Sequence, residues 1–135
     1  MNGQLISHEL GKMWLSVRQG SLIEGGSNSK IYLSASIWSE KGWFQQNPNT
    51  SKPVTPEIWH HVTVTITPGG FVTYLDGKWY HGDSEPYTGS PSAEGKLMKV
   101  CAMYNKKGRL DCDELAVWNR EFDASEVQEL YQSYQ

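Results

Sequence analysis

Hydrophobic and polar residues alternate with a period of two along several stretches of the chain. Two such stretches run from Lys12 to Gln19 and from Lys30 to Ser39, and a short one surrounds Trp43. The clearest stretch runs from Ile58 to Thr67, where valine and isoleucine alternate with threonine. Alternation of this kind predicts β-strands with two unlike faces. We therefore expect a protein built mainly of short strands.

Turn residues between these stretches predict antiparallel hairpins. The turn formed by residues 68–70, Pro-Gly-Gly, is expected to bring the chain back along residues 71–75. The dipeptide Asp76-Gly77 then separates residues 73–75 from residues 78–80. Asp-Gly favours a two-residue hairpin turn, in which both central positions need positive φ. Three consecutive antiparallel strands are therefore predicted here.

The two cysteines fall in a second predicted hairpin. Strands over residues 96–104 and 109–118 flank a four-residue turn, and counting from that turn places Cys101 opposite Cys112. Facing cysteines on paired strands form a disulfide when their Cβ atoms lie within about 4.5 Å. The alternative is a pair of buried free thiols, because isolated cysteines are often simply buried. Both alternatives stay open on the sequence.

One helix is expected, at the carboxyl end of the chain. Asp123 is a suitable N-cap, and Glu126 follows three residues later in a capping-box pattern. Four apolar or aromatic residues then fall at helical spacing on one face: Val127, Leu130, Tyr131 and Tyr134. The predicted fold is all-β, an antiparallel sandwich with a short C-terminal helix.

Charge and hydropathy exclude two classes of partner. Twelve basic and fifteen acidic residues are interspersed, so the net charge of −3 carries no basic footprint for nucleic acid. No stretch approaches the roughly 18–20 apolar residues that span a membrane. The first ten residues lack the basic start and apolar core of an export signal. Either the protein is intracellular or its export signal lies outside this sequence.

Two segments, in the same order along the chain as in the family, resemble the laminin G-like branch of the concanavalin A-like jelly rolls. IWHHVTVT at residues 58–65, followed by VTYLDGK at 72–78, is similar to a hairpin of that family. LDCDELAVWNR at 110–120 is similar to its closing segment. The resemblance implies one jelly-roll domain over residues 1–135, with Trp59 and Trp118 as core anchors between two sheets. It also implies an extracellular or cell-surface location within a larger protein.

The resemblance is weakest at the amino end, where the family's opening strand and long first loop are short or absent. The first and last strands of such sandwiches tend to pair, so a missing opening strand would leave an unpaired edge. The sequence therefore predicts a domain truncated at its N-terminus, a compact variant, or a homo-oligomer that shares an edge strand. An N-glycosylation pattern at residues 49–51, Asn-Thr-Ser, favours export.

Catalytic groups are sparse, and we predict that the protein is not an enzyme. Hydrolases of this superfamily use paired carboxylates about 5–5.5 Å apart on one strand face. The nearest pattern here is Asp111 with Asp113, and no third carboxylate follows at the required spacing. His60 and His61 are adjacent, so on a strand they would point to opposite faces and could not share a zinc ion.

Calcium is the one cofactor that the sequence suggests. Asp111 and Asp113 are its candidate ligands, and a calcium site needs several oxygen ligands at about 2.3–2.6 Å. The alternative for Asp113 is a hydrogen bond to neighbouring backbone.

The surplus of tryptophan and tyrosine is the strongest functional signal. Six tryptophans and seven tyrosines stand against three phenylalanines. Sugars stack their C–H faces on aromatic rings while polar side chains bind their hydroxyls, so at least two rings should be exposed. The candidate ligand-binding residues, at strand ends or in loops, are Trp38, Trp43, Gln45, Asn47, Trp79, Tyr80 and Tyr87.

These residues predict a non-catalytic extracellular module that binds glycan. The alternative is a protein-interaction or adhesion module, in which the same rings or an edge strand dock an extracellular partner. For each single ring, the competing interpretation is that it caps the end of a small core.

Overall fold

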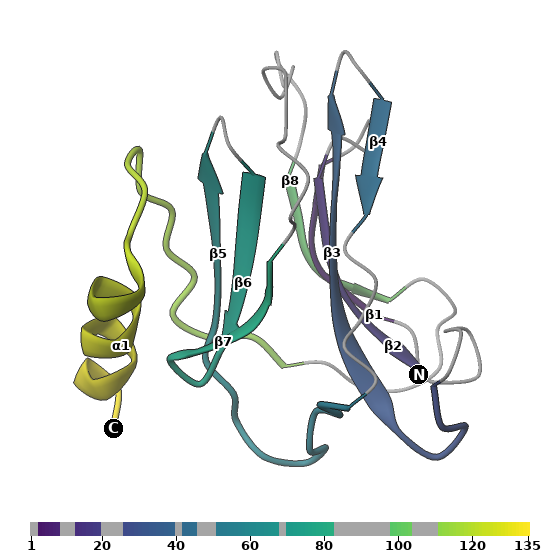
Figure 1. The fold of residues 1–135 in the computed structure, drawn as a ribbon. Coiled ribbons are helices and arrows are strands. Elements are labelled where there is room, and N and C mark those ends of the chain that lie inside the picture. Colours follow the sequence, from purple (N-terminus) through teal and green to yellow (C-terminus); the bar gives the residue numbers. More distant parts are fainter. Residues whose placement is uncertain are drawn as a thin grey trace. The chain divides into compact units, whose positions relative to one another are not determined.

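The computed structural model describes residues 3–8, 13–19, 26–39, 42–45, 51–67, 70–82, 98–103 and 111–135. Figure 1 shows their strands and helix. The chain divides into two compact units. The five-stranded unit comprises Met1–Pro56 and Gly89–Leu115, and the three-stranded unit comprises Glu57–Thr88 and Ala116–Gln135.

The five-stranded unit is one antiparallel sheet with the order β4-β3-β2-β1-β8. Its strands are β1 (Gly3–His8), β2 (Met13–Gln19), β3 (Ile31–Ser39), β4 (Gly42–Gln45) and β8 (Met98–Met103). β1 pairs with β2 on one side and with β8 on the other. β1 therefore has a partner on each side, and truncation of the domain at its N-terminus stays a prediction.

The core of the five-stranded unit surrounds β3. Residues 32–36 of this strand are all buried, and successive residues of a strand point to opposite faces. Leu33, which is 2% exposed, shares one face with Ala35, and the opposite face carries the buried residues Ser34 and Ser36. The hydroxyl oxygen of Tyr32 accepts a hydrogen bond from the backbone N–H of Ser27 at 3.2 Å. β3 is thus an interior strand covered on both faces.

The three-stranded unit contains an antiparallel sheet and the only helix in the described residues. The sheet has the order β5-β6-β7, formed by β5 (Val62–Thr67), β6 (Gly70–Leu75) and β7 (Lys78–Gly82). The register of β5 and β6 runs from Val62 opposite Leu75 to Thr67 opposite Gly70. The two predicted hairpins are confirmed. β5 begins at Val62, so residues 58–61 precede the strand.

The turn between β6 and β7 has the backbone that its sequence predicts. Asp76 has φ of 52° and Gly77 has φ of 74°, which are the positive values that a two-residue hairpin turn requires. A Cβ atom on Gly77 would lie 2.8 Å from Cδ1 of Tyr131. Glycine is therefore required at this position both by the backbone angle and by the close approach of the helix.

The C-terminal helix is α1 (Ala124–Ser133), with Asp123 as its N-cap. The Asp123 side chain accepts a hydrogen bond from the backbone N–H of Glu126, and the Glu126 side chain accepts one from the backbone N–H of Asp123, both at 2.9 Å. Val127 is fully buried, whereas Tyr134 is exposed. The helix and its capping box are confirmed.

Residues 111–118 do not form the strand that the sequence predicts. They run without regular secondary structure, and Glu114 has φ of 53°, outside the β region. The carboxylate of Asp113 accepts a hydrogen bond from the backbone N–H of Glu114 at 2.9 Å. A local bond of this kind competes with the hydrogen bonds of a strand ladder, which explains the interruption.

The two tryptophans that the resemblance places in the core are on the surface. Trp59 is 69% exposed and Trp118 is 46% exposed. Both lie in segments without regular structure, where no strand pleat directs one side chain inward. The prediction that they are buried anchors is therefore wrong for the structure. Two antiparallel sheets and one short C-terminal helix confirm the mainly β class.

Candidate functional site

Trp79 on β7 is the exposed ring among the predicted ligand-binding residues whose side chains the structure describes. Its side chain is 51% exposed, and the preceding residue, Lys78, is exposed as well. The rings of Trp79 and His81 meet edge to face, with 6.4 Å between their centroids and 80° between their planes. This contact gives the indole a fixed neighbour on its own strand. Trp79 therefore offers a ring face of the kind that sugars stack on.

Tyr80 does not belong to this surface. It is 2% exposed, so the prediction that its ring contacts a ligand is wrong. The register explains its position, because Trp79 pairs with Tyr74 and His81 pairs with Thr73, which leaves Tyr80 as the extra residue of a β-bulge. Sequence alternation alone would have separated Trp79 from Tyr80, since neighbours on a strand point to opposite faces.

A second group of candidates lies on the hairpin formed by β3 and β4. Trp38 and Trp43 are directly opposite each other in the register, and Gln45 is opposite Ser36. Directly opposed residues share a face of the sheet, as do residues two apart on one strand. The backbone register therefore brings residues 38, 43 and 45 together at the β4 edge of the sheet. Asn47 and Tyr87 lie outside the described residues.

Asp76 connects the β6–β7 turn to the chain that leads into β5. Its carboxylate lies 2.7 Å from Nδ1 of His60 and accepts a hydrogen bond from the backbone N–H of His61 at 2.9 Å. The backbone N–H of Asp76 also donates to the carbonyl oxygen of His61 at 2.8 Å. The sequence indicated Asp76 only as a turn residue. The hairpin register, which brings residue 61 close to residue 76, was the signal that could have revealed this cluster.

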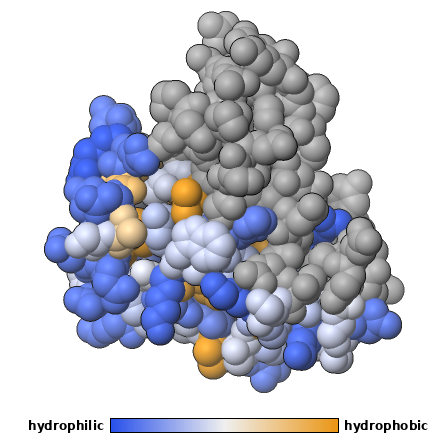
Figure 2. All heavy atoms as spheres, viewed as in Figure 1, coloured by the Kyte–Doolittle hydropathy of each residue, from blue (hydrophilic) through white to orange (hydrophobic). Residues whose placement is uncertain are grey.

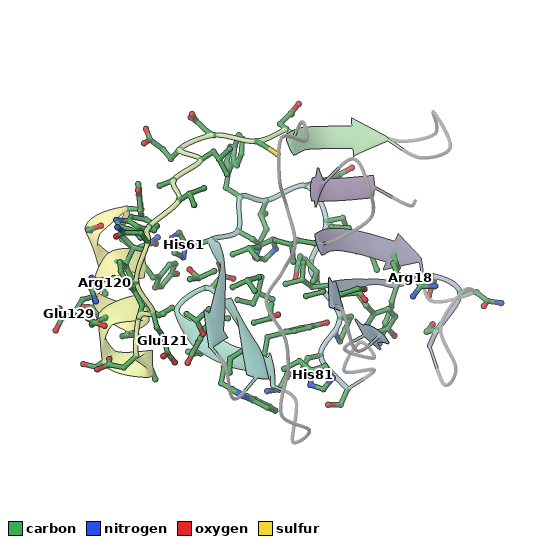
Figure 3. The ribbon with its side chains drawn as sticks, turned by 90° about the horizontal axis from the view of Figure 1, so that it is seen from above. Arg18, His61, His81, Arg120, Glu121 and Glu129 are labelled. Atoms are coloured by element: carbon green, nitrogen blue, oxygen red, sulfur yellow. The ribbon has the colours of Figure 1, made fainter. Side chains whose placement is uncertain are left out.

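His61 lies against the C-terminal helix, on the side of the three-stranded sheet seen in Figure 3. Its ring centroid is 5.9 Å from that of Tyr131 and 5.4 Å from that of Tyr134. Burial lowers the pKa of His61, and the negative charge of Asp76 offsets part of this shift. Burial also raises the pKa of Tyr74, and the charges of Glu121 and Asp123 add to that effect.

Arg120 ties the chain before α1 to the first turn of the helix. Its Nη1 donates to the Glu126 carboxylate at 2.8 Å and to the carbonyl oxygen of Glu121 at 3.2 Å. The guanidinium carbon lies 4.3 Å from the centroid of the Phe122 ring, which in turn lies 4.9 Å from that of Trp118. The side chain of Arg120 thus joins this segment to the helix.

The predicted calcium ligands, Asp111 and Asp113, are both exposed. Asp113 makes the backbone hydrogen bond that was the alternative to metal binding. Within the described ranges, no group of three or more His, Cys, Asp or Glu residues is placed to hold a metal ion. Calcium binding by Asp111 and Asp113 stays a prediction.

Cys112 is disulfide-bonded. Cys101 is the other of the two cysteines in the chain. The bond therefore agrees with the predicted pair, although the strand that was expected to carry Cys112 is not formed at residues 111–118. No helix in the described part of the chain is long and apolar enough to cross a membrane.

Among solved structures, the chain is similar to a crystal structure of an S-layer domain-containing protein (residues 221–444) from Clostridium thermocellum ATCC 27405. The two share 16% sequence identity with a TM-score of 0.43, and the match covers 88% of this chain and 55% of the other. The chain thus spans about half of that structure. No curated protein matches the sequence.

A family model does match, and it covers most of the chain. The model is a laminin G model described as "Concanavalin A-like lectin/glucanases superfamily", and it matches residues 15–128. The matched range includes both segments that carry the resemblance, at residues 58–78 and 110–128. The chain belongs to the laminin G-like family of the concanavalin A-like lectin/glucanase superfamily.

Proposed function

We propose that this protein is a non-catalytic module that binds carbohydrate outside the cell or at the cell surface, as part of a larger protein. Family membership supports a binding module as the class of function. The half-exposed ring of Trp79 is the observation that favours carbohydrate. In this proposal the two sheets stack as a jelly-roll sandwich, and exposed aromatic rings outside the core contact the ligand.

The surroundings of Trp79 suit a sugar. An indole face covers the apolar C–H face of a pyranose ring, and nearby donors bind the hydroxyl groups. The ring of His81, on the same strand, lies against the indole and carries an N–H donor. Residues Trp38, Trp43 and Gln45 add aromatic and amide groups on the hairpin of β3 and β4. Both groups have the composition that sugar binding requires.

Glycan arrays probed with the whole chain test this proposal. We expect binding to at least one glycan class and a loss of about tenfold or more in affinity for Trp79→Ala, the size of a stacking contact worth about 1–3 kcal/mol. Trp59→Ala is the matched control, because Trp59 is more exposed than Trp79 but lies outside the candidate site. Trp43→Ala tests the second group. Equal binding by wild type and Trp79→Ala would reject Trp79 as the contact.

A protein partner is the second candidate, and residues near β5 favour it. Ile58 and Trp59 are adjacent and strongly exposed, just before β5, which is an edge strand of its sheet. An uncharged edge strand such as VTVTIT pairs readily with a strand of another chain. On the face seen in Figure 2, however, the described residues are mostly hydrophilic and the apolar ones lie apart. A concentration-dependent dimer that binds no glycan would favour this alternative.

A further inference from the structure

The C-terminal helix meets the three-stranded sheet through a small group of polar and aromatic side chains. Tyr131 and Tyr134 of α1 flank the ring of His61, and Tyr131 also lies against the Gly77 backbone. Thr63 Oγ1 lies 3.5 Å from Nδ1 of His61. Figure 3 shows His61 on the side of the sheet that faces the helix. His61 is therefore the titratable group at the centre of this contact.

We propose that α1 is a pH-sensitive latch, in which neutral His61 holds the helix on the three-stranded sheet and protonated His61 loosens it. This device lies apart from Trp79 and does not depend on the proposed carbohydrate binding. Its physical basis is the partial burial of an imidazole ring beside the sheet and two tyrosine rings. The half-buried ring loses part of its hydration in the docked state, and a charge on it regains that hydration when the tyrosines withdraw.

Several titratable groups lie around His61, and those that act on its ring oppose the effect of burial on its pKa. Asp76, in the β6–β7 turn, and the ring faces of Tyr131 and Tyr134 favour the charged imidazole. His60, next in the chain, pairs with Asp76. The two carboxylate oxygens of Asp76 already contact Nδ1 of His60 and the backbone N–H of His61. The attraction between Asp76 and the His61 ring is therefore indirect, and the cost of burial exceeds it.

The direction of the pKa shift agrees with this balance. Burial lowers the pKa of His61 from 6.5, and the charge of Asp76 compensates only in part. The released or unfolded state then binds a proton more readily than the docked state. Docking is thus fully stabilised above pH 6.5 and loses this stabilisation as the pH falls through the lower pKa of the docked state. Acid is expected to release α1 from the sheet.

Hydrogen exchange on the whole chain measures the attachment of α1 directly. Amide protection of residues 124–133 is compared at pH 7.5 and pH 5.0 after correction for intrinsic exchange rates. We expect protection of α1 to fall relative to β6 in acid, because the released state then binds a proton more readily than the docked state. His61→Phe keeps an aromatic ring but cannot titrate, so it should abolish the difference. His81→Phe is the control and should keep it.

Two results would overturn the latch. One is equal α1 protection at both pH values in the wild type, and the other is an unchanged pH effect in His61→Phe. If His61→Phe does not fold, an NMR titration of the wild type takes its place. The ring signals of Tyr131 and Tyr134 should then shift with the same midpoint as His61. Tyrosine signals that stay constant while His61 titrates would equally reject the proposal.

Discussion

The two units of the molecule are stabilised by partly different means. In the five-stranded unit, burial dominates, because residues 32–36 of β3 are covered on both faces. In the three-stranded unit, Tyr80 and Val127 are buried as well, and side chains of the turn and the helix cap add hydrogen bonds. Asp76 bridges two segments there, and Asp123 and Glu126 start the helix. Apolar alternation and burial therefore organise both units, and the three-stranded unit adds specific polar bonds at its turn and at its helix cap.

Leu33→Ala should be the largest single loss, because it removes a fully buried side chain from β3. We expect the free energy of unfolding to fall by about 2–5 kcal/mol. Urea denaturation followed by circular dichroism measures it. Lys30→Ala, at an exposed position just before β3, is the control and should change stability by less than about 0.5 kcal/mol. A loss as small as that of the control would contradict the conclusion that burial dominates the stability of this unit.

Gly77→Ala should cost less, about 1–3 kcal/mol, through two separable effects. Alanine is strained at φ of 74°, and its Cβ would lie 2.8 Å from Tyr131. Combining it with Tyr131→Ala should remove the steric part and leave the backbone part. A double-mutant cycle by urea denaturation shows whether the two changes are coupled. Purely additive losses would show that α1 does not press on the turn.

Asp123→Ala should be the smallest of these losses, about 1 kcal/mol, through the lost helix cap. Because the cap belongs to α1, the effect should appear first in the hydrogen exchange of residues 124–133. Asp123→Ser retains a capping oxygen and should restore most of the stability. Equal exchange in Asp123→Ala and Asp123→Ser would mean that the capping box contributes little to the three-stranded unit.

The sequence predicted the features that depend on neighbouring residues. Alternation located β2, β3 and the β5–β6 hairpin. Asp76-Gly77 predicted the turn between β6 and β7, and Asp123 with Glu126 predicted the start of α1. Each of these features rests on a local pattern, which is visible in a short stretch of sequence.

Features that depend on distant residues or on single backbone angles were predicted less well. The bulge at Tyr80 arises from the pairing of β7 with β6, and no residue type in the sequence predicts it. Glu114 adopts a left-handed backbone in a stretch that otherwise favours a strand. The contact of His61 with α1 joins residues about 70 positions apart, so no local pattern could reveal it.

The proposed carbohydrate binding depends most on whether Trp79 contacts a ligand. An NMR titration of the whole chain with array-selected glycans follows the indole N–H signals of the six tryptophans. We predict that the Trp79 signal shifts in a saturable manner while the Trp59 signal does not. Glycan binding that leaves Trp79 unmoved, or a chain in which no indole signal responds to any glycan, would contradict the proposed site.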